Sequence, residues 1–142
     1  MDLIITALGY DGSVLDTVLN AVVLIAVLTA LSAQRRSPWW IVLIVMAVLQ
    51  VALWLAAGAV GFSVVWAGLA GAVVVELGVR SGSRPRQLSM LVIALVVVLA
   101  AIIYYAVTLP LITTIAHLLA LVLGVGIQML ARRILRTSGA RT

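Results

Sequence analysis

The sequence contains a single histidine, His117, and imidazole is the only side chain that acts as a base near neutral pH without a perturbed pKa. A serine hydroxyl within hydrogen-bonding distance of the ring would complete a minimal pair of nucleophile and base. The chain has no cysteine and no lysine, so thiol catalysis, thiolate metal sites and Schiff-base chemistry are excluded. A nucleophile and base pair of serine and histidine is therefore one chemistry that these residues could carry out.

The composition decides what kind of fold must position these groups. Of the 142 residues, 65% are hydrophobic and only 9% are charged, and the mean hydropathy is +1.34. A soluble domain is about 45–50% apolar and about 25% charged, so this composition excludes a soluble enzyme or a nucleic-acid-binding module. The net charge of +5 is not clustered on one basic face, and no nucleic-acid partner is expected.

Apolar runs of about 20 residues, the length that crosses a hydrocarbon core, occur five times. They predict an all-α, polytopic membrane protein with five transmembrane helices. The predicted helices cover residues 15–33, 38–58, 61–79, 87–108 and 112–131. The corresponding division of the chain is a short outer-side segment 1–14, a transmembrane domain 15–135 and a basic cytoplasmic tail 136–142.

The arginines predict the orientation of these helices. All nine follow the first, third or fifth apolar run, and alternating helices would place those three segments on one side of the membrane. By the positive-inside rule that side is the cytoplasm. The sequence therefore predicts a multi-pass protein of the inner (cytoplasmic) membrane, embedded in the lipid bilayer, with its N-terminus outside and its C-terminus in the cytoplasm.

Counting 1.5 Å per residue from the nearest arginine gives the depth of each polar side chain. Asn20, Gln50, Ser63 and His117 each lie about 21–25 Å from the cytoplasmic boundary, on four different helices. We expect this polar layer to face the bundle interior, because lipid cannot satisfy hydrogen-bonding groups. The layer has two interpretations, which are a catalytic site and hydrogen bonds that hold the helices together.

Other acidic and polar residues favour ordinary structural roles. Glu76 lies one turn before Arg80, a spacing that predicts an ion pair within the helix. A metal site would need several convergent ligands, and His117, Asp16 and Glu76 are too sparse. No metal and no cofactor are therefore expected.

Local motifs resemble those of the rhomboid intramembrane serine proteases. The stretch Gly61-Phe62-Ser63-Val64 resembles the Gly-x-Ser-Gly motif that begins the nucleophile helix of that family. Ala116-His117, followed by small residues at Ala120 and Gly124, resembles its last core helix. Leu19-Asn20 is similar to its His-x-x-x-Asn helix. The resemblance covers about residues 15–135 and would make the five helices the second to sixth of a six-helix core.

The resemblance implies a role for each matching residue. Ser63 would be the nucleophile and His117 its base. Asn20 and the backbone at Val64, together with Gly61, would hold the oxyanion and the substrate. The small residues Gly68, Gly71, Ala120 and Gly124 would be helix-packing contacts. Such an enzyme would cleave membrane-protein segments.

The chain also departs from the family pattern. Val64 replaces the second glycine, Asp16 replaces the histidine of the Asn20 helix, and Ala67 replaces the aromatic residue that packs under the histidine, with Trp66 about 100° away on the helix. The first family helix is missing, so a second copy or another membrane protein is expected to cover one flank, either at the first predicted helix or at the outer end of the second, around Trp54. A non-catalytic relative, or a small structural subunit that binds transmembrane helices of partners, is the alternative function.

Overall fold

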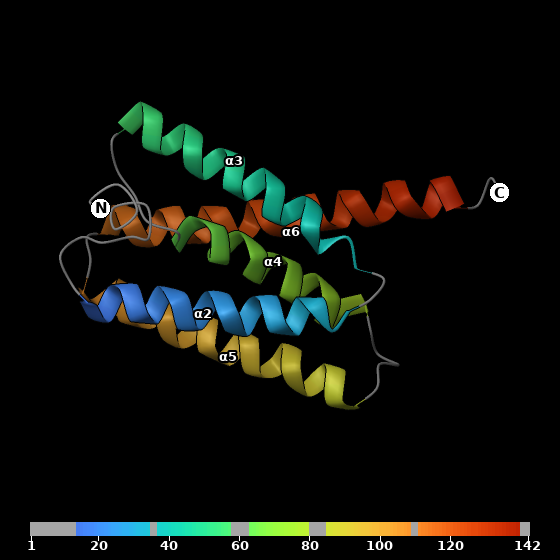
Figure 1. The fold of residues 1–142 in the computed structure, drawn as a ribbon, viewed down its shortest axis with the longest axis horizontal. Coiled ribbons are helices and arrows are strands. Elements are labelled where there is room, and N and C mark those ends of the chain that lie inside the picture. Colours follow the sequence, from blue (N-terminus) through green and yellow to red (C-terminus); the bar gives the residue numbers. More distant parts are fainter. Residues whose placement is uncertain (1–13, 35–36, 58–62, 80–84, 109–110, 140–142) are drawn as a thin grey trace.

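The computed structural model describes residues 14–34, 37–57, 63–79, 85–108 and 111–139. Within these ranges the fold is all-α, as predicted, with five helices (Figure 1). Their bounds are α2 Val14–Ser32, α3 Trp39–Ala57, α4 Ser63–Val79, α5 Pro85–Thr108 and α6 Leu111–Gly139. Gly61 and most of the predicted outer segment 1–14 lie outside the described residues.

Prolines mark the start of two helices. Pro38 directly precedes α3, and its carbonyl accepts a hydrogen bond from the backbone N–H of Ile41 at 3.0 Å. Pro85 is the first residue of α5, a position that suits proline because its missing N–H would have no partner inside the helix. The predicted start of this helix at residue 87 was therefore two residues late.

The last helix is longer than the apolar run that predicted it. It continues through Arg132 and Arg133 to Gly139, because arginine is a good helix former and the backbone hydrogen bonds do not depend on the lipid. Residues 136–139, which the sequence placed in a separate tail, thus belong to α6.

The helices alternate in direction, and α4 lies in the middle. Helices α2, α4 and α6 run one way and α3 and α5 run back (Figure 1). Helix α4 packs against each of the other four, and thirteen of its seventeen residues are buried. The N-terminal ends of α2, α4 and α6 therefore meet at one end of the bundle, together with the C-terminal end of α5.

Three helices are long and apolar enough to cross a membrane. They are α2, α5 and the Leu111–Thr137 part of α6, whereas Trp39–Leu53 and Ser63–Val79 are shorter apolar helices. Their outward faces carry large apolar side chains, including Ile25, Ile103 and Val122, each more than 60% exposed. Such surfaces are stable in lipid but not in water, so the chain is a multi-pass membrane protein.

Candidate functional site

The site is built on a close crossing of α4 and α6. A β-carbon added to Gly124 would lie 2.6 Å from the carbonyl carbon of Gly68, and one added to Gly71 would lie 2.9 Å from the carbonyl carbon of Gly124. Real β-carbons do not approach other atoms so closely, so only glycine allows the two backbones to touch at this point. Ala120, one turn before Gly124, is also buried.

The crossing brings the two candidate catalytic residues to the same end of the bundle. Because α4 and α6 run in the same direction, Ser63 lies about 8 Å before the crossing and His117 about 10 Å before it. Asn20, Gln50, Ser63 and His117 are all less than 10% exposed. The prediction that the polar layer faces the bundle interior is confirmed.

His117 packs in a cluster of three aromatic rings. Its imidazole lies 5.2 Å from the Tyr105 ring, nearly parallel to it at 9°, and 5.3 Å from the Trp66 ring at 27°. The Trp66 and Tyr105 rings are 6.2 Å apart. Offset, near-parallel packing of this kind is favourable for aromatic rings and fixes the plane of the imidazole.

One hydrogen bond fixes the tautomer of His117. Its Nδ1 lies 2.7 Å from the Thr113 carbonyl oxygen, which can only accept, so Nδ1 donates and carries the proton. In the neutral ring Nε2 then holds the free electron pair. This nitrogen is buried and has no hydrogen-bond partner, an arrangement that is uncommon in proteins.

Asn20 connects α2 to the aromatic cluster. The indole Nε1 of Trp66 donates a hydrogen bond of 2.7 Å to the Asn20 Oδ1. An indole nitrogen can only donate, so this bond also identifies which end of the amide is the oxygen. The amide nitrogen of Asn20 is the end left to donate to another group.

Ser63 and Val64 form the start of α4, where the backbone N–H groups have no hydrogen-bond partner within the helix itself. The Ser63 side chain is 8% exposed and Val64 is 6% exposed. Among the described residues, no hydrogen bond joins the Ser63 hydroxyl to His117, because Nε2 has no partner.

The aromatic residues beside His117 differ from the sequence expectation. The motif comparison placed the aromatic position at Ala67 and left it empty, but Trp66 and Tyr105 pack against the imidazole instead. The same residue count from the nearest arginine could have identified Tyr105 as a neighbour of the site. It lies 19 residues after Arg86, which corresponds to about 28 Å from the predicted cytoplasmic boundary, close to the level of Ser63.

A second polar cluster lies at the opposite end of α4, around the buried carboxylate of Glu76. Its Oε1 accepts hydrogen bonds from Ser37 Oγ (2.7 Å), Gln128 Nε2 (2.7 Å) and Arg132 Nε (2.9 Å). The Arg132 guanidinium makes a second contact with Oε2. Arg80, the partner expected from the sequence, lies outside the described residues.

This Glu76 cluster joins α4 and α6 to Ser37, which lies two residues before α3. Arg132 neutralises the buried charge and Ser37 and Gln128 supply further donors, which is the condition for burying a carboxylate. Gln128 also donates to Ser37 Oγ at 2.8 Å. The cluster therefore holds three helices together at the end of the bundle away from His117.

No protein-family model, curated protein or solved structure matches the chain. The rhomboid relationship therefore stays a prediction from the sequence motifs.

The described residues contain no group of three or more His, Cys, Asp or Glu side chains that could hold a metal ion.

Proposed function

We propose that the chain is a rhomboid-like intramembrane serine protease that cleaves transmembrane or juxtamembrane segments of other membrane proteins. The observation that carries this proposal is the buried Nε2 of His117, which holds a free electron pair and has no hydrogen-bond partner. It lies at the same end of the bundle as the Ser63 hydroxyl, on the helix that packs most extensively against the helix of Ser63.

An unpaired buried acceptor costs about 1–3 kcal/mol, so the free Nε2 of His117 favours a use for this nitrogen beyond helix packing. In His117 only Nδ1 is paired, and that bond directs the basic nitrogen away from Thr113. Catalytic hydrogen bonds are often long in enzymes without substrate and tighten when it binds. This arrangement fits a general base that would accept the proton of the Ser63 hydroxyl.

In the proposed reaction, Ser63 Oγ attacks the scissile carbonyl carbon while His117 Nε2 takes the hydroxyl proton. The same proton passes to the leaving amine when the C–N bond breaks, and an acyl-enzyme remains on Ser63. Water then attacks the ester, again with His117 as base, and releases the new carboxyl end and free Ser63.

In the proposed reaction, three donors would stabilise the negative charge that develops on the carbonyl oxygen. The backbone N–H groups of Ser63 and Val64 are free of helical partners at the start of α4, and the Asn20 amide nitrogen is the third. The protonated imidazole would lie within 6 Å of the Trp66 and Tyr105 ring faces, a distance at which a cation is stabilised by an aromatic face.

The proposal includes five membrane spans, with the N-terminus outside and the C-terminus in the cytoplasm of a cell with an inner membrane. Helices α2 and α4 run in the same direction, so α3 has to return between them. At 19 and 17 residues, α3 and α4 are about 28 and 25 Å long. Helix α4 can be shorter than a lipid-exposed span because protein rather than lipid surrounds it.

A non-catalytic relative that binds transmembrane helices is the second candidate. It is favoured by the buried Val64 side chain, which fills the place of the second motif glycine next to Ser63, and by the absence of a Ser63–His117 hydrogen bond within the described residues. In that case the same buried groups would serve helix packing alone.

A fluorophosphonate probe separates the two candidates, since it reacts only with an activated serine. The purified protein should be labelled, and both S63A and H117A should abolish labelling, because residues that act as one unit fail together. S89A is the matched control, since Ser89 is exposed on α5 and its hydroxyl donates to the Pro85 carbonyl oxygen. V64G restores the family motif, and a V64G protein that stays unlabelled would assign the chain to the non-catalytic relatives.

A further inference from the structure

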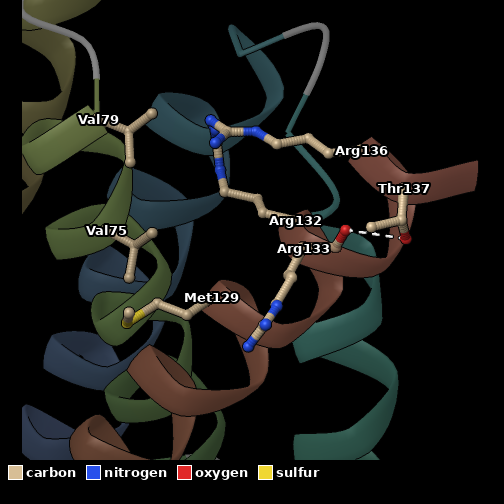
Figure 2. A pocket seen from close by; sticks show the side chains of 7 residues that line it. All are labelled: Val75, Val79, Met129, Arg132, Arg133, Arg136 and Thr137. Carbon is tan, nitrogen blue, oxygen red and sulfur yellow. Dashed lines mark hydrogen bonds between the residues drawn. The ribbon is translucent and has the colours of Figure 1, made fainter. Parts of the chain in front are cut away.

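An open groove of about 260 Å³ lies between the C-terminal ends of α4 and α6 (Figure 2). It is distant from Ser63 and His117, and the proposed proteolysis does not use it. Its lining consists of Val75, Val79, Met129, Arg132, Arg133, Arg136 and Thr137. We propose that this groove binds an anionic phospholipid, with the lipid phosphate at the arginines and an acyl chain on the apolar side chains.

The charge of the groove comes from one face of α6. Met129, Arg132, Arg133 and Arg136 follow each other at the three- and four-residue spacing that aligns side chains on a helix. In Figure 2, Arg132 and Arg136 extend to one side of the groove and Arg133 to the other. Arg132 is neutralised by Glu76, whereas Arg133 and Arg136 are exposed and form no ion pair with other described residues.

The depth of the groove matches the lipid headgroups. A hydrocarbon core of about 30 Å takes about 20 helical residues, so a span that begins at Leu111 leaves it near residue 131. The guanidinium groups therefore lie where lipid phosphates lie. Juxtamembrane arginines are attracted to anionic lipids, and a planar guanidinium binds phosphate through two parallel hydrogen bonds.

The apolar part of the groove lining favours a lipid over a free phosphate ion as the ligand. Val79 is 45% exposed and Met129 is 60% exposed, directly beside the arginines. A helix C-terminus attracts positive side chains in any protein, but that effect does not explain an apolar surface next to them. An acyl chain would cover this surface, which lies between Arg136 on one side of the groove and Arg133 on the other, and an inorganic anion would leave it bare.

Binding of a fluorescent phosphatidylglycerol to the purified protein in neutral detergent micelles, followed by anisotropy, tests the proposal. We expect tighter binding than for the phosphatidylcholine analogue. R133Q and R136Q should each weaken phosphatidylglycerol binding about fivefold, the loss expected for one basic residue at a membrane surface. R86Q is the matched control, because it removes one exposed arginine from the same end of the bundle but outside the groove.

Three results would overturn the assignment. Equal binding of the two lipids would show that charge is not recognised. An R86Q protein as weak as R133Q would show that the attraction is diffuse and not seated in the groove. Displacement of the labelled lipid by millimolar inorganic phosphate would identify a small-anion site instead. Circular dichroism of each variant establishes that it is folded, so a loss of binding reports on the groove.

Discussion

Replacing Gly124 by alanine tests whether the backbone contact between α4 and α6 positions the candidate site. The added β-carbon would lie 2.6 Å from the Gly68 carbonyl carbon, whereas ordinary contacts begin near 3.4 Å. The atoms in the way belong to the backbone and cannot rotate aside. The two helices must therefore separate by about 0.8 Å or more, because no side-chain movement can relieve the overlap.

The cost of this separation can be worked from the same contacts. A gap of about 0.5–1 Å forfeits a quarter to a half of the dispersion energy of each contact that it opens, and overpacking typically costs about 1–3 kcal/mol. Helix propensity returns about 1 kcal/mol when glycine becomes alanine. Because the clashing atoms are backbone, we take the upper end of the overpacking range, which after the gain in helix propensity leaves a net loss of about 2 kcal/mol and a fall of several degrees in the Tm.

Thermal unfolding in detergent, followed by circular dichroism, measures this effect. G126A is the matched control, because Gly126 is on the same helix and an added β-carbon there meets nothing within 4 Å. Its Tm should stay the same or rise. G124A should also lose fluorophosphonate labelling, because Ser63 and His117 are carried on the two separated helices. A G124A protein as stable as G126A would refute the close crossing.

Three further predictions concern the polar clusters and the orientation. E76Q removes the charge that neutralises Arg132, and we expect a loss of about 3 kcal/mol, the lower end for breaking a buried ion pair, in thermal unfolding; an unchanged Tm would argue against the Glu76 cluster. W66F leaves the Asn20 Oδ1 without its donor and should cost about 1–3 kcal/mol, whereas W40F, at an exposed position, should not. An impermeant thiol reagent on intact cells should label a cysteine introduced at Ser13 but not one at Ser81, and the reverse pattern would invert the orientation.

Most of the fold could be predicted because apolar runs are interrupted by charges and prolines. The predicted start and end of α2 each lie one residue from the observed Val14–Ser32. The end of α6 could not be found in this way, because Arg132 and Arg133 end the apolar run but the helix continues past them to Gly139.

The burial of the candidate site residues could be predicted from the sequence, but not the rotation of each helix about its axis. Counting residues from the arginines placed Asn20, Ser63 and His117 in one buried layer, because rise along a helix is constant. The Trp66–Asn20 hydrogen bond and the packing of Tyr105 on His117 depend on how each helix is rotated about its axis, which residue spacing does not report. The contact between Glu76 and Arg132 was missed for a related reason, since spacing identifies neighbours only within one helix.

The Glu76 cluster lies at the N-terminal end of α3, so a tilt of this helix about that end would displace its C-terminal end most. Ser37, just before α3, is held by Glu76 and Gln128, while Val48, Val51 and Leu55 along the far half are more than half exposed. A rotation of about 10° about Ser37 would carry the far end of this 19-residue helix through about 5 Å. The far end of α3 lies at the end of the bundle where α4 and α6 begin, so a small tilt at Ser37 becomes a displacement of several ångströms at the end that carries Ser63 and His117.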